Sequence, residues 1–268
     1  MPDPSKQKSN AGRKPNAASK RDRFIGPSLL MWALMLSPAL GIAALLMLAS
    51  ASDLPDTETL ANPKTAPATR IYTVDGVQLG SFYRENRADV RYNDLPESLV
   101  QALICTEDVR FRDHTGVDFK SLARAIIYLA KRGGGSTITQ QLAKQLFTER
   151  YDRTGFFERA VRQKPKEWIS ATRLERQYTK DEIIGLYLHR YGFVNPAVGI
   201  RSAAQVYFGK SVQSLDVHES AMLVGMLKNS ALFNPLRRPE LVAERRATVL
   251  SQMAKYGVLP ANDLDSLN

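Results

Sequence analysis

Apolar and polar residues divide the 268-residue chain into segments of different character. An apolar run occupies residues 29–49 and contains no charged residue in 21 positions. At about 1.5 Å of rise per residue, a helix of this length crosses the roughly 30 Å hydrocarbon core of a bilayer. Membrane helices tolerate a proline such as Pro38. The pattern therefore predicts one N-terminal transmembrane helix.

The segment before this run, residues 1–28, carries seven basic residues against two acidic ones and is rich in Pro, Ser, Asn and Lys. Such a composition predicts a disordered tail, and its positive charge predicts that the tail stays in the cytoplasm while the rest of the chain is exported. A cleaved signal peptide is the alternative, because the small residues at 49–51 resemble a cleavage site.

After the apolar run, the polar and apolar positions predict a linker and then one globular domain. Residues 50–69 are rich in Pro, Ala, Thr and Asp and are typical of a linker. Alternating residues on both sides of Asp75–Gly76 predict a small β-hairpin near the membrane. From Leu95 onward the apolar spacing is helical, so residues 70–268 are expected to form a mainly α domain. The expected helices cover 95–111, 119–135, 136–147, 166–178, 180–191, 199–208, 216–228 and 239–256.

Composition excludes several kinds of site. Cys105 is the only cysteine, so the chain has no intramolecular disulfide and no cluster of Cys and His ligands for zinc. The formal net charge is +10, with a pI of about 9.7, and half of that charge lies in the tail. Anionic lipid at the cytoplasmic surface accounts for a basic tail, so no nucleic-acid partner is expected.

The stretch at 106–119, "TEDVRFRDHTGVDF", concentrates groups that can transfer protons. Glu107 and Asp108 end an apolar helix, and Phe111, His114 and Asp118 follow. Such carboxylates can act as a general base, but they can equally be solvated charges at a helix end that pair with neighbouring arginines. A thiol nucleophile is disfavoured, because Cys105 falls on the apolar side of the helix.

Two further segments carry polar groups that could bind an anionic substrate. In "GGGSTITQQLAKQ", glycines lead into a helix start with capping residues Ser136 and Thr137, where free amides and the helix dipole favour an anion. Gln140, Gln141 and Lys144 can line one stretch of that helix, although a solvated face explains them equally well. The basic segment 162–183 contains Glu167 and is also compatible with ordinary charge pairs along a helix.

Taken together and in order, these segments resemble the peptidoglycan glycosyltransferases, the transglycosylase domains of class A penicillin-binding proteins and of monofunctional peptidoglycan transglycosylases. The resemblance extends from about Ile71 to Tyr256. Downstream, "YTKDEIIGLYL", "SAAQVYFGKS" and "ESAMLVGML" continue it. Its leading motifs are Glu107-Asp108-x-x-Phe111-x-x-His114-x-Gly116-x-Asp118, then Gly134-Gly135-Ser136-Thr137-Ile138-Thr139-Gln140-Gln141-Leu142-x-Lys144, then Lys164-x-Lys166-Glu167.

The resemblance implies a lysozyme-like helical fold and the polymerisation of lipid II into glycan strands by inverting transfer. It implies Glu107 as the general base and Glu167 as a second acid. Lys144 and Arg159 are expected to face the undecaprenyl diphosphate leaving group. Mg²⁺ or Mn²⁺ is a plausible cofactor for a diphosphate substrate, without a metal site made of protein ligands alone. The expected substrate-binding residues are Asp108, Phe111, His114, Ser136, Thr137, Gln140, Gln141, Lys144, Arg159 and Lys164.

The expected location is the cytoplasmic (inner) membrane, with a single pass and the catalytic domain on the outer, periplasmic side. Expected partners are lipid II, the growing glycan strand, the membrane and other cell-wall synthesis proteins. The sequence departs from the family pattern at Gln145, Gln163, Pro165, His189 and in 192–199. These departures keep open the alternative of a non-catalytic cell-wall scaffold. A lytic transglycosylase, which would share the fold but use its glutamate as an acid, is a second alternative.

Overall fold

The structure of the chain is a computed structural model that separates into two compact units, residues 1–47 and 48–268. It describes residues 31–33, 35–37, 40–41, 43–44, 47, 69–75, 78–82, 90–127, 134–147, 163–195, 197–260 and 262. The described residues of the first unit are helical, and the predicted cytoplasmic tail lies outside the described residues. No helix among the described residues combines the length and the hydropathy that a membrane crossing requires. The transmembrane helix at 29–49 stays a prediction.

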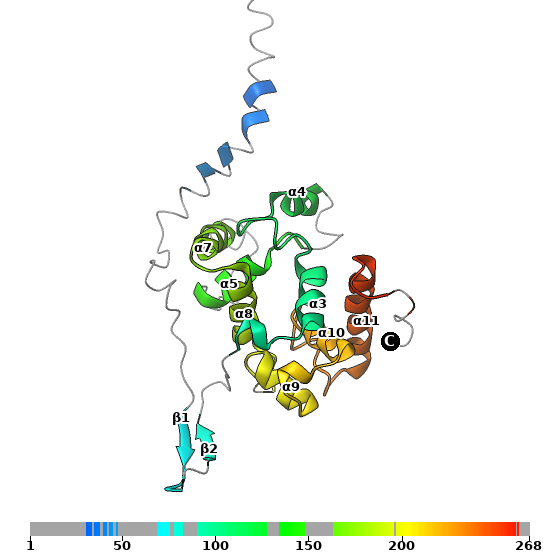
Figure 1. Cartoon of the computed structure of the whole chain (residues 1–268). Coiled ribbons are helices and arrows are strands. Elements are labelled where there is room, and N and C mark those ends of the chain that lie inside the picture. Colours follow the sequence, from blue (N-terminus) through cyan, green and yellow to red (C-terminus); the bar gives the residue numbers. More distant parts are fainter. Residues whose placement is uncertain are drawn as a thin grey trace, which may run out of the picture. The chain divides into compact units, whose positions relative to one another are not determined.

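The second unit is mainly helical over its described residues, as the sequence predicts (Figure 1). The strands β1 and β2 pair antiparallel, with an irregular register between Ile71 and Tyr72. The elements are β1 (Thr69–Tyr72), β2 (Gln78–Phe82), η1 (Tyr92–Asp94), α3 (Glu97–Glu107), α4 (Phe119–Ile127), α5 (Ile138–Phe147), α7 (Lys164–Gln177), α8 (Lys180–Arg190), α9 (Ile200–Phe208), η3 (Val212–Ser214), α10 (Val217–Met226) and α11 (Pro239–Lys255).

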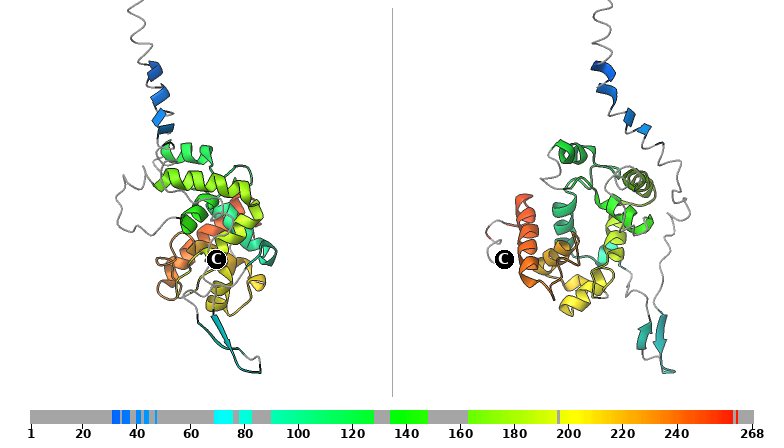
Figure 2. Two further views of the ribbon diagram at one scale, coloured as in Figure 1. Left: turned by 90° about the vertical axis from the view of Figure 1, so that its left-hand side faces the viewer. Right: turned by 180° about the vertical axis from the view of Figure 1, so that it is seen from behind.

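The helices pack in two groups that share one core. In the first group, α3 packs against α10 and α11, and in the second α5 packs against α7 and α8 (Figures 1 and 2). Leu99 and Leu103 of α3 are four residues apart, so they lie on one face of the helix, and both are fully buried. Burying each such side chain stabilises the fold by about 1.5–3 kcal/mol. The end of α3 is where the two groups meet, through contacts of its last residues with α5.

The first helix of the domain ends at Glu107, four residues before the end that its apolar pattern predicts. Asp108 leaves the helical conformation with φ −157° and ψ 76°. Phe111, which the apolar pattern had assigned to the helix, is instead buried from the following turn. A buried side chain can be supplied by a loop as well as by a helix, so apolar spacing alone misplaced this boundary.

Asp118 closes the loop after α3 and starts α4. Its carboxylate accepts the backbone N–H groups of Lys120 and Ser121, at 3.0 and 3.1 Å, and takes both a 2.6 Å and a 3.1 Å hydrogen bond from the Arg110 guanidinium. Burial alone would raise the pKa of Asp118, but hydrogen bonds from Arg110 and Ser121 outweigh it and lower the pKa to about 2. The carboxylate is therefore ionised at neutral and at mildly acidic pH.

Gly116 brings the same loop against α7. Its φ is +95°, and a Cβ at this position would lie 2.8 Å from the backbone carbon of Ala171. A glycine is required both for the backbone angle and for the close approach. The loop is thereby held at a fixed distance from α7.

The segment 192–199, which departs from the glycine-rich family pattern, still forms a left-handed turn. Val194 and Asn195 have φ values of 57° and 52°, which is rare for a β-branched residue such as valine. The Asn195 side-chain amide donates to the Tyr207 hydroxyl at 3.1 Å and to Asn234 Oδ1 at 3.3 Å. The hydrogen bonds of the Asn195 side chain stabilise this left-handed turn, which glycine would adopt without strain.

Gly116→Ala is expected to destabilise the protein much more than Gly209→Ala. Gly209 has a φ of +65° but nothing within 4 Å of its added Cβ, so alanine there costs only the left-handed backbone, about 1–2 kcal/mol. At Gly116 the backbone of α7 must also move, which should add at least about 2 kcal/mol. Urea unfolding of both variants measures the difference, and equal losses would show that α7 does not constrain the loop.

Asp118→Asn is expected to lower stability by about 1–2 kcal/mol near neutral pH, which is less than the full pKa shift implies because the partly exposed Arg110 is screened by solvent. A carboxyl whose pKa is lower in the folded state stabilises the fold above its unfolded pKa, near 3.8, and loses this effect as the pH falls through about 2. The difference in melting temperature between parent and variant should therefore shrink below pH 4. Asp113→Asn, at an exposed position in the same loop, is the control. A difference that is independent of pH would contradict the ion pair.

Candidate active site

Glu107 is the last residue of α3, and its carboxylate lies between two other helices. The Gln141 side-chain amide, on α5, donates to Glu107 Oε2 at 3.0 Å. The Arg245 guanidinium, on α11, lies 3.6 Å from the other oxygen, Oε1, and the Glu107 side chain is 16% exposed. The carboxylate is therefore held by a hydrogen bond at one oxygen, and its side chain keeps a small exposed surface.

Gln141 is itself held by a buried phenol. The Tyr187 hydroxyl donates to Gln141 Oε1 at 2.8 Å, so the amide must present its N–H groups to Glu107. Burial, with a smaller effect from the charge of Glu107, raises the pKa of Tyr187 well above its usual value. Burial also raises the pKa of Tyr191 to about 12, again with a contribution from Glu107. Both phenols stay neutral, so Tyr187 remains a hydrogen-bond donor.

Asp108 points into the protein, unlike its neighbour Glu107. His114 Nε2 lies 2.9 Å from Asp108 Oδ2, and the backbone N–H of Ile138, the first residue of α5, donates to the same oxygen at 3.1 Å. The backbone N–H of Gly116 donates to His114 Nδ1 at 3.2 Å, which assigns the ring proton to Nε2. Phe111 packs edge-on against the His114 ring. These residues hold the loop to the start of α5.

The start of α5 is capped by the protein itself. Thr137 Oγ1 accepts the backbone N–H of Gln140 at 3.1 Å and donates to the Gly116 carbonyl at 2.6 Å. Thr137 and Gln140 are each 2% exposed. The backbone N–H groups of Ile138 and Gln140 are thus already hydrogen-bonded within the protein. An anion near this helix end would interact with the helix dipole and not with these two N–H groups. Contact of Thr137 and Gln140 with substrate stays a prediction.

Ser136, Lys164 and Glu167 meet beside the same end of α5. Lys164 Nζ donates to Ser136 Oγ at 3.0 Å and to Glu167 Oε2 at 2.7 Å, within the first turn of α7. Glu167 is buried, whereas the Lys164 side chain is 39% exposed. The ammonium group is held in place by two partners while part of it remains open to a ligand.

Of the two cations expected to face a diphosphate, Lys144 and Arg159, the structure describes only Lys144. Lys144 is an exposed residue of α5, one turn beyond Gln141, and forms no ion pair with any residue in the described part of the chain. Arg159 lies outside the described residues. Their role at the leaving group stays a prediction.

The structure thus gathers the sequence-predicted residues into two neighbouring clusters along α5. Glu107 and Gln141 form one, and Asp108, His114 and the capped start of α5 lead to the other, formed by Ser136, Lys164 and Glu167. Sequence reasoning missed Tyr187 and Arg245. Tyr187 lies within a segment that the family resemblance had marked, whereas Arg245 is one of several basic residues on α11 and has no local signal.

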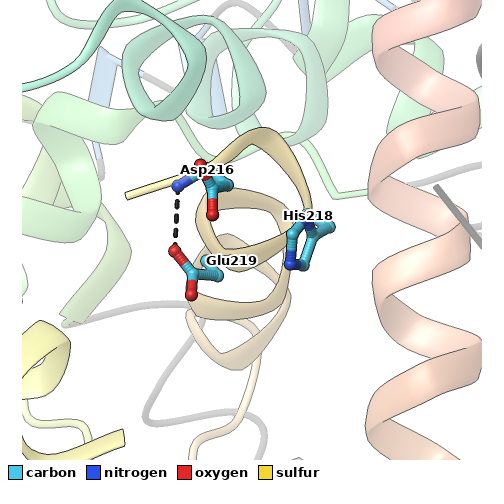
Figure 3. A group of neighbouring side chains, drawn as sticks. All are labelled: Asp216, His218 and Glu219. Carbon is cyan, nitrogen blue, oxygen red and sulfur yellow. Dashed lines mark hydrogen bonds between the residues drawn. The ribbon is translucent and has the colours of Figure 1, made fainter. Parts of the chain in front are cut away.

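Asp108 and Glu167, two carboxylates of the site, are each bonded to donors of the protein. Binding of Mg²⁺ or Mn²⁺ together with a diphosphate stays a prediction. Among the described residues, the one group with metal-ligand spacing is Asp216, His218 and Glu219 at the start of α10 (Figure 3). Lys210 Nζ lies 2.9 Å from Asp216 Oδ2 and 2.9 Å from Glu219 Oε1, so one ammonium group already pairs with both carboxylates of that cluster.

The chain is similar in sequence to penicillin-binding proteins. Penicillin-binding protein 1A of Pseudomonas aeruginosa is 40% identical over 210 residues, which cover 77% of this chain and 25% of that protein. Penicillin-binding protein 1F of Bacillus subtilis is 38% identical over 200 residues, with 73% and 27% covered. The chain therefore spans about a quarter of the length of these relatives.

Two further comparisons address the fold and the family. The crystal structure of Penicillin-Binding Protein 1A from Haemophilus influenzae aligns with a TM-score of 0.43 and 22% identity, covering 76% of this chain and 20% of that chain, a likeness too low to assign the fold. A family model described as Transglycosylase matches residues 75–254, about two thirds of the chain. The chain therefore belongs to the transglycosylase family, in agreement with the resemblance of its motifs to the transglycosylase domain of class A penicillin-binding proteins.

Proposed function

We propose that this protein is a membrane-anchored peptidoglycan glycosyltransferase that polymerises lipid II into glycan strands. The observation that carries the proposal is the geometry of Glu107. Gln141 binds its Oε2, while no hydrogen-bond donor of the described residues lies within bonding distance of Oε1. A carboxylate oriented on one oxygen and open on the other has the form that a general base requires.

The reaction needs such a base because a sugar hydroxyl is a poor nucleophile. Glu107 Oε1 would accept the proton of the 4-hydroxyl of the incoming disaccharide as that oxygen attacks the anomeric carbon of the growing strand. The bond from this carbon to the diphosphate oxygen breaks, and the electron pair leaves with the undecaprenyl diphosphate. One displacement inverts the configuration and needs no covalent intermediate on the enzyme.

The leaving group needs positive charge more than it needs a proton, because a diphosphate is already a stable anion. Lys164, held by Ser136 and Glu167, supplies a positioned cation at the start of α5. Lys144 supplies a second, exposed cation further along the same helix. Arg159 is proposed to add a third. In this arrangement Glu167 orients Lys164 rather than exchanging protons with substrate.

The lipid carrier of the substrate determines where the reaction takes place. We infer that the apolar run at 29–49 anchors the chain in the inner membrane, with residues 1–28 in the cytoplasm and the catalytic domain outside. Other cell-wall synthesis proteins are proposed as partners. The membership of the transglycosylase family supports this location, since lipid-linked substrates are met at the membrane surface.

Glu107→Gln is expected to lower the rate of lipid II polymerisation by about 10²–10⁴-fold, because the amide keeps the shape of the side chain but cannot accept the proton. The variant should still fold but melt at a somewhat lower temperature, because it leaves the mostly buried Arg245 guanidinium without its acidic partner. Glu97→Gln, an exposed glutamate at the start of the same helix, is the matched control. A folded Glu107→Gln protein that makes glycan strands at the parent rate would rule out the proposed base.

Lys144→Ala is expected to slow polymerisation about tenfold or more, because removing one charge that faces the diphosphate raises the cost of its departure. Lys255→Ala, an exposed lysine at the end of α11, is the control for a general loss of positive charge. Rates measured over a range of salt concentrations separate a local role from long-range attraction of the anionic substrate, which salt would screen. Equal rates for the two variants would remove Lys144 from the leaving-group side.

A further inference from the structure

We propose that Arg245 is a positioning residue for the reaction, which places its charge beside the open oxygen of Glu107 and holds that carboxylate in its place between α5 and α11. The inference rests on the proposed function, because it concerns the same carboxylate. It adds α11, the last helix of the described domain, to the active site. The sequence had assigned no site residue to this helix.

Contacts with α10 and with Phe233 fix the position of the Arg245 side chain. Its Nε donates to the carbonyl of Gly225, on α10, at 3.4 Å, and its Cζ lies 6.0 Å from the centre of the Phe233 ring. A Cβ at Gly225 would come within 3.1 Å of Arg245 Cγ, so the glycine leaves room for the arginine stem to cross α10. The arginine side chain is only 13% exposed. A buried guanidinium is costly unless a negative charge is near it.

Glu107 supplies that negative charge. It is the one acidic group of the described residues within ion-pair distance of Arg245, and Arg245 is likewise the one cation within that distance of Glu107. Burial lowers the pKa of Arg245, and the charge of Glu107 opposes this effect. Among the described residues, Glu107 also bonds to Gln141 of α5 and lies near the phenols of Tyr187 and Tyr191, all of which are neutral.

The separation of the pair suits a base better than a tight salt bridge would. At 3.6 Å from Nη2 to Oε1, the contact is too long for a hydrogen bond but close enough for a strong charge interaction. Oε1 therefore keeps its lone pairs for the proton of the substrate. The charge of Arg245 attracts Oε1 and so restrains the carboxylate without using the lone pairs that the substrate proton needs.

The test is the rate of lipid II polymerisation, with kcat and KM determined for the purified full chain in detergent. In Arg245→Met, which retains an apolar stem, kcat should fall about tenfold, with little change in KM, because the base is no longer held in the reacting geometry. Arg245→Lys should restore most of the parent kcat, because it restores the charge. Arg237→Met, at an exposed arginine just before the same helix, should match the parent.

The outcomes separate the inference from the proposed function. A folded Arg245→Met protein with the parent kcat and KM overturns the role of Arg245, as does a raised KM with an unchanged kcat, which would indicate a substrate contact. If Arg245→Met does not fold, Arg245→Gln and Arg245→Lys make the same comparison of neutral and charged side chains. A parent protein without polymerisation, or one that is insensitive to Glu107→Gln, overturns the proposed function instead.

Discussion

The arrangement of the site depends on one buried carboxylate, that of Asp108. It binds the imidazole of His114 and the first amide of α5, and so ties the end of α3, the following loop and the start of α5 together. A buried carboxylate is costly unless its oxygens are hydrogen-bonded, and both partners lie within hydrogen-bond distance of the same oxygen. Gly116 and Asp118 complete this connection by holding the loop against α7 and α4. The positions of Glu107 and Gln141 both follow from it.

The two adjacent acids Glu107 and Asp108 therefore have different surroundings. Glu107 still belongs to α3 and projects between α5 and α11, whereas Asp108 has left the helix and projects inward. Residues one position apart on a helix point about 100° away from each other, and the change of backbone conformation at Asp108 adds to this difference. The position of the helix end thus decides which acid is available to substrate and which one is structural.

The departures from the family pattern fall at positions that the structure can accommodate. Pro165 lies in the first turn of α7, where a missing backbone N–H costs no helical hydrogen bond. Gln163 precedes that helix, and His189 is buried in the last turn of α8. Gln145 is the exception, because its buried Oε1 has no hydrogen-bond partner among the described residues. None of these positions removes a group that contacts Glu107.

The sequence by itself determined the mainly helical class, the order of the helices and the family, because helical periodicity and ordered motifs are local properties of the chain. It also named Glu107, Asp108, Gln141, Lys164 and Glu167. Only the tertiary structure decided that Thr137 and Gln140 bond to the loop, that Lys164 pairs with Ser136 and Glu167, and that Tyr187 and Arg245 face the Glu107 side of the site. Such contacts join residues up to about 140 positions apart, and no local spacing encodes them. They arise from how buried polar groups find partners once the two helix groups have packed.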